Sequence, residues 1–282
     1  MTGKEAAATA AAEPGSRNLL TRVAAALVLA PTAIAIAWAG GWFWTALVSL
    51  VAIGLYVEWL MIVGVAHDKR AVAAGIIALA CAGLTLASGR LDVALAAVTL
   101  GLLAVVGFSA ERRGWAAAGF CYAAAAEFAS VLVRLDAAAG LAALILVLLV
   151  VWVTDIGGYF AGRGLGGPKL WPRVSPKKTW AGAFGGFIAS LAVAAGFSLS
   201  GFGRMGPLLM LGAVLSVASQ LGDLFESAVK RRFGVKDSSH LIPGHGGLLD
   251  RLDGFVAAIV LAFIIGISRG GVDGAGRGLM VW

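Results

Sequence analysis

Carboxylate side chains that could hold a metal ion gather in the second half of the sequence. Asp250 and Asp253 are three residues apart, so on a helix they share one face, and Asp223 precedes them in an apolar segment. Carboxylates held together repel one another unless a cation lies between them. Mg²⁺ takes oxygen ligands and fits best where phosphates complete its shell, although the ligand type alone also allows Ca²⁺. The pattern predicts a divalent-metal site; the alternative is a salt-bridge cluster with Lys230 and Arg251.

The apolar segment around Asp223 also carries a polar stripe. Its members are spaced three and four residues apart, which places them on one face of a helix. They are Ser216, Ser219, Gln220, Asp223, Glu226, Ser227 and Lys230. Hydrogen bonds between helices would be enough to explain Ser216 and Ser219, whereas the carboxylate of Asp223 needs a nearby cation.

A basic, glycine-rich loop over residues 162–180 could bind phosphates. Its basic residues are Arg163, Lys169, Arg173, Lys177 and Lys178. We expect a flexible loop whose last residues, Ser175 to Thr179, lead into the N-terminus of a helix. Backbone N–H groups, a serine and two lysines at such a place favour an anion. The alternative is a loop that contacts only lipid headgroups.

Two further residues have more than one interpretation. Asp155 shares a predicted helix face with Tyr159, and it could be a third carboxylate of the site or a partner of Arg163. His245, within a Pro-Gly-His-Gly-Gly segment, could act as a general base or hold the turn. No Ser–His–Asp arrangement is present to favour acyl transfer. Acidic metal ligands beside basic phosphate ligands suit phosphoryl or nucleotidyl transfer.

The elements that must position these residues are membrane-spanning helices. Of the 282 residues, 60% are hydrophobic and only 13% are charged, against about 25% in soluble domains. This excludes a soluble enzyme, a disordered chain, a disulfide scaffold and nucleic-acid binding as the main role. We predict an all-α polytopic membrane protein with about nine spans, because about 20 apolar residues cross a bilayer as a helix. The predicted spans are 20–39, 42–63, 71–88, 91–109, 115–133, 139–161, 180–200, 206–229 and 254–270.

The basic residues predict the orientation of the chain. With the N-terminus in the cytoplasm, 17 of the 22 Lys and Arg residues fall in cytoplasmic segments, as the positive-inside rule requires. The loops 162–179 and 230–253 then share that side, which predicts a polar active site facing the cytoplasm. We divide the chain into a disordered tail (1–18), a transmembrane scaffold (19–138), a transmembrane catalytic region (139–270) and a C-terminal tail (271–282).

The segment Ser227–Asp253 closely resembles the signature of phosphatidate cytidylyltransferases (CDP-diacylglycerol synthases). Its matching residues are Ser227, Val229, Lys230, Arg231, Lys236, Asp237, Pro243, His245, Gly246, Gly247, Leu248, Asp250, Arg251, Leu252 and Asp253. The run Gln220–Glu226, the segment Ser175–Thr179 and a weaker block at Asp155 also resemble the family. One departure is Ala181, where relatives often carry a polar or acidic residue. The resemblance covers roughly residues 150–255.

The resemblance implies that the chain makes CDP-diacylglycerol and pyrophosphate from CTP and phosphatidic acid with Mg²⁺. We predict Asp223 and Asp250 as metal ligands and Asp253 as a ligand or a support for one. Ser175, Lys177 and Lys178 would bind CTP phosphates, and Lys230 and Arg231 the lipid phosphate or the leaving pyrophosphate. The predicted catalytic residues also include His245. Further predicted substrate-binding residues are Arg163, Thr179, Lys236, Asp237 and Arg251.

The family further implies a second, monovalent cation and a homodimer in the inner (plasma) membrane, with membrane lipids but no nucleic acid as partners. Two other functions remain open. A membrane transferase that acts with CTP on an isoprenoid phosphate or alcohol would carry similar headgroup chemistry. A transporter with an intramembrane ion site is disfavoured, because the charges form cytoplasmic loops and the two halves show no inverted repeat.

Overall fold

The computed structural model describes residues 30–239 and 246–282. Eight helices in these residues are long and apolar enough to cross a membrane, which confirms an all-α polytopic membrane protein. They are α2 (Gly41–Ile62), α3 (Lys69–Ala87), α4 (Leu91–Phe108), α5 (Arg113–Leu135), α6 (Gly140–Leu165), α7 (Trp180–Leu199), α8 (Met205–Arg232) and α9 (Leu249–Gly270). The first predicted span, 20–39, is described only from residue 30, and Ala30–Ala39 is an apolar helix.

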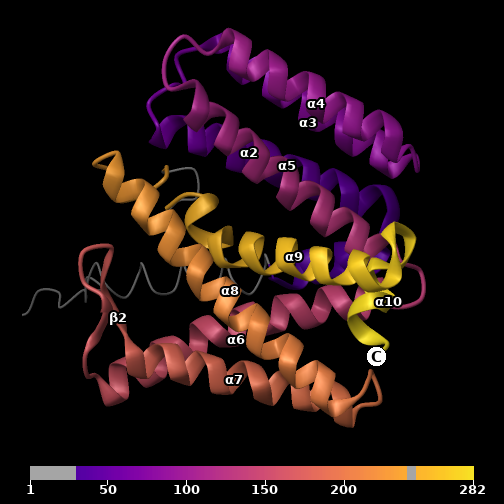
Figure 1. Ribbon diagram of the computed structural model, residues 1–282, viewed down its shortest axis with the longest axis vertical. Coiled ribbons are helices and arrows are strands. Elements are labelled where there is room, and N and C mark those ends of the chain that lie inside the picture. Colours follow the sequence, from indigo (N-terminus) through magenta and orange to yellow (C-terminus); the bar gives the residue numbers. More distant parts are fainter. Residues whose placement is uncertain (1–29, 240–245) are drawn as a thin grey trace, which may run out of the picture.

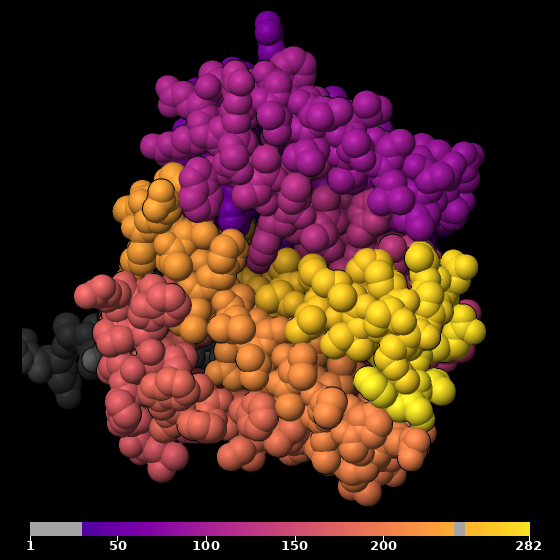
Figure 2. All heavy atoms as spheres, viewed as in Figure 1, coloured from indigo at the N-terminus to yellow at the C-terminus, as the bar shows by residue number. Residues whose placement is uncertain are grey.

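The helices form layers, and α9, the last span in the sequence, lies between the N-terminal helices and the layer of α6, α7 and α8 (Figure 1). α3 and α4 pack together at one end and α2 pairs with α5, while α6 and α7 pack together at the other end. α9 packs against both α8 and α5, and so joins the C-terminal helices to the N-terminal ones. The space-filling view shows the two halves as two packed layers (Figure 2).

Two clusters of buried apolar side chains hold these layers together. One lies among α5, α6, α8 and α9 and includes Leu144, Leu215 and Ile259. The other is built around α2, where Trp59 packs between α5 and α8. The Trp59 ring stacks on Tyr122, with centroids 5.5 Å apart, and on Phe225, at 6.1 Å. Aromatic contacts thus connect the N-terminal helices to α8, which carries the polar stripe.

Glycines allow α6 and α7 to pack with their backbones close together. The sequence pattern places Gly182 and Gly186 on one face of α7. A Cβ atom on Gly182 would lie 2.8 Å from the Gly158 carbonyl oxygen of α6, and one on Gly186 would meet the Thr154 carbonyl. The small-residue face is therefore confirmed, and it is used within the chain.

The segment 162–180 was expected to be a flexible loop, but part of it forms regular secondary structure. Its residues form an antiparallel hairpin of β1 (Lys169–Trp171) and β2 (Ser175–Thr179), with Lys169 opposite Thr179. Thr179 then caps α7, because its hydroxyl oxygen accepts a hydrogen bond from the Gly182 N–H at 3.1 Å. The hairpin holds the basic side chains against the start of α7.

The C-terminal residues fold back onto the helices. Residues 272–280 form the short helices η1 (Val272–Gly274) and α10 (Ala275–Met280), and Leu279 is buried. Asp136, in the link between α5 and α6, accepts hydrogen bonds from the Arg277 N–H at 2.7 Å and from Arg277 Nε at 3.2 Å. Burial raises the pKa of the Asp136 carboxyl. Its hydrogen bonds to Arg277 and to the N–H groups of the link outweigh this effect and hold the pKa below its ordinary value of 3.8.

We predict that Asp136→Asn lowers the free energy of unfolding by about 1–3 kcal/mol at neutral pH, because a charge-assisted contact is lost. A lowered pKa stabilises the folded state above pH 3.8, and this contribution is lost as the pH falls through the folded-state value. The difference between wild type and variant should therefore become smaller as the pH falls below 3.8. Unfolding in detergent between pH 7 and pH 3 measures this. The exposed pair Arg90–Asp92 supplies the control, Asp92→Asn, which should have little effect.

Candidate active site

A polar cavity of about 750 Å³ lies among the ends of α6, α8 and α9, the start of α7 and the hairpin. Nine of the predicted site residues line it, although they come from four different elements. They are Arg163, Lys177, Lys178, Thr179, Asp223, Lys230, Asp250, Arg251 and Asp253. The fold therefore brings together most of the acidic and basic residues that the sequence singled out.

Three carboxylates face one part of this cavity. Asp223 of α8 forms an ion pair with Lys178 of the hairpin. Asp253 of α9 and Asp155 of α6 lie close enough to interact electrostatically with both partners of that pair. Asp253 is fixed further by the Gly254 N–H, which donates to its Oδ1 at 2.8 Å. Lys178 is thus the cation that offsets the negative charge of Asp223 in this arrangement.

Lys230 ties Asp250 to α8. Its ammonium lies 2.6 Å from Asp250 Oδ1 and 2.6 Å from Glu226 Oε2, and all three groups are largely buried. Asp250 also accepts hydrogen bonds from the Ser238 N–H at 3.1 Å and the Gly247 N–H at 2.9 Å. The alternative interpretation of Asp250, an ion pair with Lys230, is therefore present in the structure.

The carboxylates suit a hard metal ion by chemistry but are not gathered around one point. Among the described residues, no three His, Cys, Asp or Glu side chains meet closely enough to hold a metal. Lys178 and Lys230 instead pair with two of the acids. Asp155, Asp223 and Asp253 nevertheless share one cavity wall, and their oxygen atoms are ligands that Mg²⁺ prefers.

The polar stripe of α8 is confirmed, and its members differ in role. Ser216 accepts a hydrogen bond from Thr154 of α6 at 2.9 Å, which is the interhelical bonding that explains it structurally. Ser219 packs against Gly254 of α9. From Gln220 onward the stripe lines the cavity, where Asp223, Glu226 and Lys230 add charged groups.

The remaining predicted residues lie apart from the cavity lining. Arg231 is exposed and donates to the Val235 carbonyl at 3.1 Å, and Lys236 and Asp237 are exposed beyond α8. Ser175 is at the start of β2. Arg163, by contrast, lines the cavity, and it donates to the Tyr159 hydroxyl at 2.8 Å rather than forming an ion pair with Asp155. His245 lies outside the described residues.

The structure adds Glu58, which the sequence pattern assigned only to the N-terminal scaffold. This carboxylate of α2 is 2% exposed. Oε1 accepts from the Ser239 hydroxyl at 2.6 Å and the Leu248 N–H at 2.8 Å, and Oε2 from the Ser238 hydroxyl at 2.9 Å and the Leu249 N–H at 2.8 Å. Glu58 therefore joins both ends of the signature loop and the first turn of α9. An acidic residue in an apolar span was the only signal for it in the sequence.

Gly247 makes this arrangement sterically feasible. A Cβ atom at Gly247 would lie 2.6 Å from Glu58 Oε2 and would overlap the Ser238 hydroxyl. Gly246, with φ of 81°, occupies the left-handed region that favours glycine. The paired glycines of the signature thus allow the chain to pass close to Glu58 and to aim the Gly247 N–H at Asp250.

Comparisons with known proteins match nearly the whole chain. The profile of the cytidylyltransferase family matches residues 20–268. The chain is 40% identical over 257 residues to proteins named phosphatidate cytidylyltransferase from Brucella suis biovar 1 and Brucella abortus biovar 1, covering 88% of this chain and 93% of each relative. It is also 46% identical over 128 residues to the protein of that name from Staphylococcus epidermidis, covering 45% of this chain and 49% of the relative.

We predict that Glu58→Gln loosens the start of α9 and lowers the free energy of unfolding by about 2–4 kcal/mol, because an amide cannot accept all four hydrogen bonds. Hydrogen exchange at the Leu248 and Leu249 amides should become faster. Glu127→Gln is the matched control. Glu127 is also a buried glutamate of the bundle, and its carboxylate accepts one hydrogen bond, from Ser49 at 2.6 Å. Unchanged exchange at both amides in Glu58→Gln would contradict the role of Glu58.

Proposed function

The chain belongs to the cytidylyltransferase family, and from this we infer that it is a membrane nucleotidyltransferase that makes CDP-diacylglycerol and pyrophosphate from CTP and phosphatidate. The observation that carries this conclusion is the polar cavity at the ends of the spans. It combines lysines and arginines suited to phosphates with carboxylates suited to a metal ion. A water-soluble triphosphate and a lipid phosphate can meet only at such a boundary between membrane and water.

We propose that the hairpin and the start of α7 bind the triphosphate. Lys177 and Lys178 extend from β2 into the cavity, and Arg163 faces them from the end of α6. Lys178 is paired with Asp223 in the structure. A bound triphosphate would compete for that ammonium and leave the Asp223 carboxylate available. The hairpin would thus act as a clamp on the phosphates rather than as a contact to lipid headgroups.

We propose that Mg²⁺ is held by Asp223 and Asp253, with Asp155 as a further carboxylate on the same wall and with Asp250, which the sequence also predicted as a ligand. Asp250 would have to share its oxygen atoms with Lys230, because the two groups are paired. When bound, the metal ion offsets the charge of the triphosphate and of the leaving pyrophosphate. A second, monovalent cation remains part of this proposal, since the wall carries more acids than one ion needs.

The reaction requires two anions to approach each other. A phosphate oxygen of phosphatidate attacks the α-phosphorus of CTP and forms the new P–O bond. The bond from that phosphorus to the bridging oxygen breaks, and pyrophosphate leaves with the electron pair. Phosphatidate is anionic near neutral pH, so it needs no strong general base. The basic side chains of the cavity position the two substrates and reduce their repulsion. Lys230, buried between Glu226 and Asp250, would orient the lipid phosphate.

We further propose that the cavity faces the cytoplasm from the inner membrane and that the chain works as a homodimer. The basic residues of the hairpin and of the end of α8 support this orientation. The Gly182 and Gly186 face is already occupied by α6, so a dimer would have to use other surfaces.

We predict that the purified protein transfers label from α-labelled CTP to phosphatidate when Mg²⁺ is present and releases pyrophosphate. The same assay with an isoprenoid phosphate separates this function from the related transferase, because the two lipids differ only beyond the phosphate. Labelled lipid is expected from phosphatidate and little from the isoprenoid phosphate. Transfer to the isoprenoid phosphate alone, or to neither lipid, would contradict the proposed function.

A further inference from the structure

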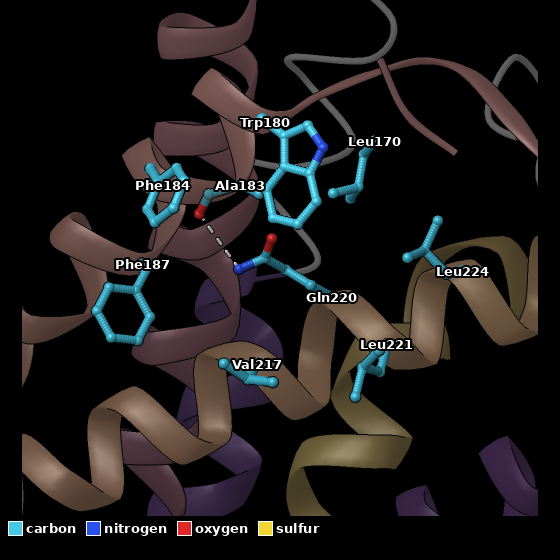
Figure 3. A pocket seen from close by; sticks show the side chains of 9 residues that line it. All are labelled: Leu170, Trp180, Ala183, Phe184, Phe187, Val217, Gln220, Leu221 and Leu224. Carbon is cyan, nitrogen blue, oxygen red and sulfur yellow. Dashed lines mark hydrogen bonds between the residues drawn. The ribbon is translucent and has the colours of Figure 1, made fainter. Parts of the chain in front are cut away.

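An apolar groove of about 350 Å³ runs beside the polar cavity (Figure 3). It lies between the first two turns of α7 and the second half of α8, and Leu170 of the hairpin closes one end. Its other lining residues are Trp180, Ala183, Phe184, Phe187, Val217, Gln220, Leu221 and Leu224. All but Gln220 are apolar, so the groove has no chemistry for a charged or strongly polar ligand.

The groove and the polar cavity share three residues, Leu170, Ala183 and Gln220. Gln220 lies at the boundary, and its amide nitrogen is 3.4 Å from the Ala183 carbonyl oxygen and 3.4 Å from the Ser216 hydroxyl. Figure 3 shows this amide between Trp180 and the apolar floor formed by Val217 and Leu221. A molecule that extends from the cavity into the groove therefore passes from charged to apolar surroundings at Gln220.

We propose that this groove binds one acyl chain of the phosphatidate substrate. The inference rests on the proposed function, and it assigns a place to the part of the substrate that the polar cavity cannot hold. The phosphate would lie in the cavity, the glycerol ester region beside Gln220, and the chain between α7 and α8. The charged cavity thus matches the phosphate end of the lipid, and the apolar groove matches its acyl chain.

The size and openness of the groove fit a lipid chain that enters sideways. From Trp180 to Phe187, α7 rises by about 10 Å, which is room for the upper part of one chain. The volume is at the lower end of the range for ligand pockets, so it does not suit two chains side by side. Phe184 is 61% exposed and Leu221 59% exposed. In a membrane such walls face lipid, and a chain can slide between them without leaving the bilayer.

The groove would act by positioning rather than by hydrophobic affinity. A lipid chain in the bilayer is already in an apolar environment, so its transfer to the groove gains little from the exclusion of water. What the groove supplies is a fixed direction for the chain, and through the ester region a fixed place for the phosphate. A small displacement of a reacting group can lower the rate by large factors.

Val217→Trp tests this directly, because it puts a large side chain on the floor of the groove. We expect kcat/KM for dioleoyl phosphatidate to fall by about tenfold or more. The value for dihexanoyl phosphatidate, whose chains reach less far, should change by less than about twofold, and the KM for CTP should not change. Val214→Trp is the matched control. Val214 is on the same helix, is 39% exposed against 46% for Val217, and lies outside the groove.

The two lipids and a binding measurement make every outcome informative. If kcat/KM of Val217→Trp falls equally with both lipids, or with neither, the groove is not the acyl-chain site. Wild-type protein that makes no CDP-lipid from either would instead contradict the proposed function. In that case photolabelling with a phosphatidate that carries a diazirine on its chain still tests the groove. Labelling of α7 and α8 that phosphatidate displaces and phosphatidylcholine does not would support it, and labelling displaced equally by both would overturn it.

Discussion

The arrangement of this protein depends on the cost of placing carboxylates within membrane-spanning helices. An aspartate at the centre of a span costs about 2.5–3.5 kcal/mol on insertion scales, so each one needs a partner or access to water. The cavity meets this requirement in two ways. Asp223 and Asp250 pair with Lys178 and Lys230, while Asp155 and Asp253 face the same polar space. The partners are lysines that a phosphate could also bind, so bound substrates would exchange the ion pairs that stabilise the cavity.

The same constraint explains why the N-terminal helices support the cavity. Glu58 lies in α2, far in sequence from the signature loop, and its carboxylate accepts four hydrogen bonds from groups at the two ends of that loop. Without α2, the N–H groups at the start of α9 would lose the Glu58 carboxylate as their acceptor. Asp250 and Asp253 belong to the first turns of the same helix, so their positions depend on this contact. The aromatic stack of Trp59 on Phe225 adds a second connection, from α2 to α8. The N-terminal half thus positions α8 and the start of α9, which line the polar cavity.

Hydropathy predicted the positions of most spans. It misplaced the start of α9, where charged residues of the helix pair with residues distant in the sequence. The predicted span 42–63 agrees with α2 (Gly41–Ile62). The predicted span 254–270 begins five residues later than α9, which starts at Leu249, because the charges of Asp250 and Asp253 indicated a loop. In the structure both residues are helical, and Asp250 pairs with Lys230. The hairpin was predicted as a loop, since its short, basic strands contain a proline and no alternation of apolar residues. Most cavity residues could be predicted from motifs and helix periodicity. Glu58 could not, because its partners are contacts between distant segments.

In the proposed function, the acidic wall of the cavity binds a divalent cation together with CTP. Electron paramagnetic resonance of Mn²⁺, a substitute for Mg²⁺, counts bound metal without any need for turnover. With CTP present, wild-type protein should bind Mn²⁺ and Asp223→Asn should bind it at least about tenfold more weakly, because a charged ligand is lost. Asp273→Asn, in the exposed η1 turn, should bind as wild type does. Equal Mn²⁺ affinity in wild type and Asp223→Asn would contradict the account.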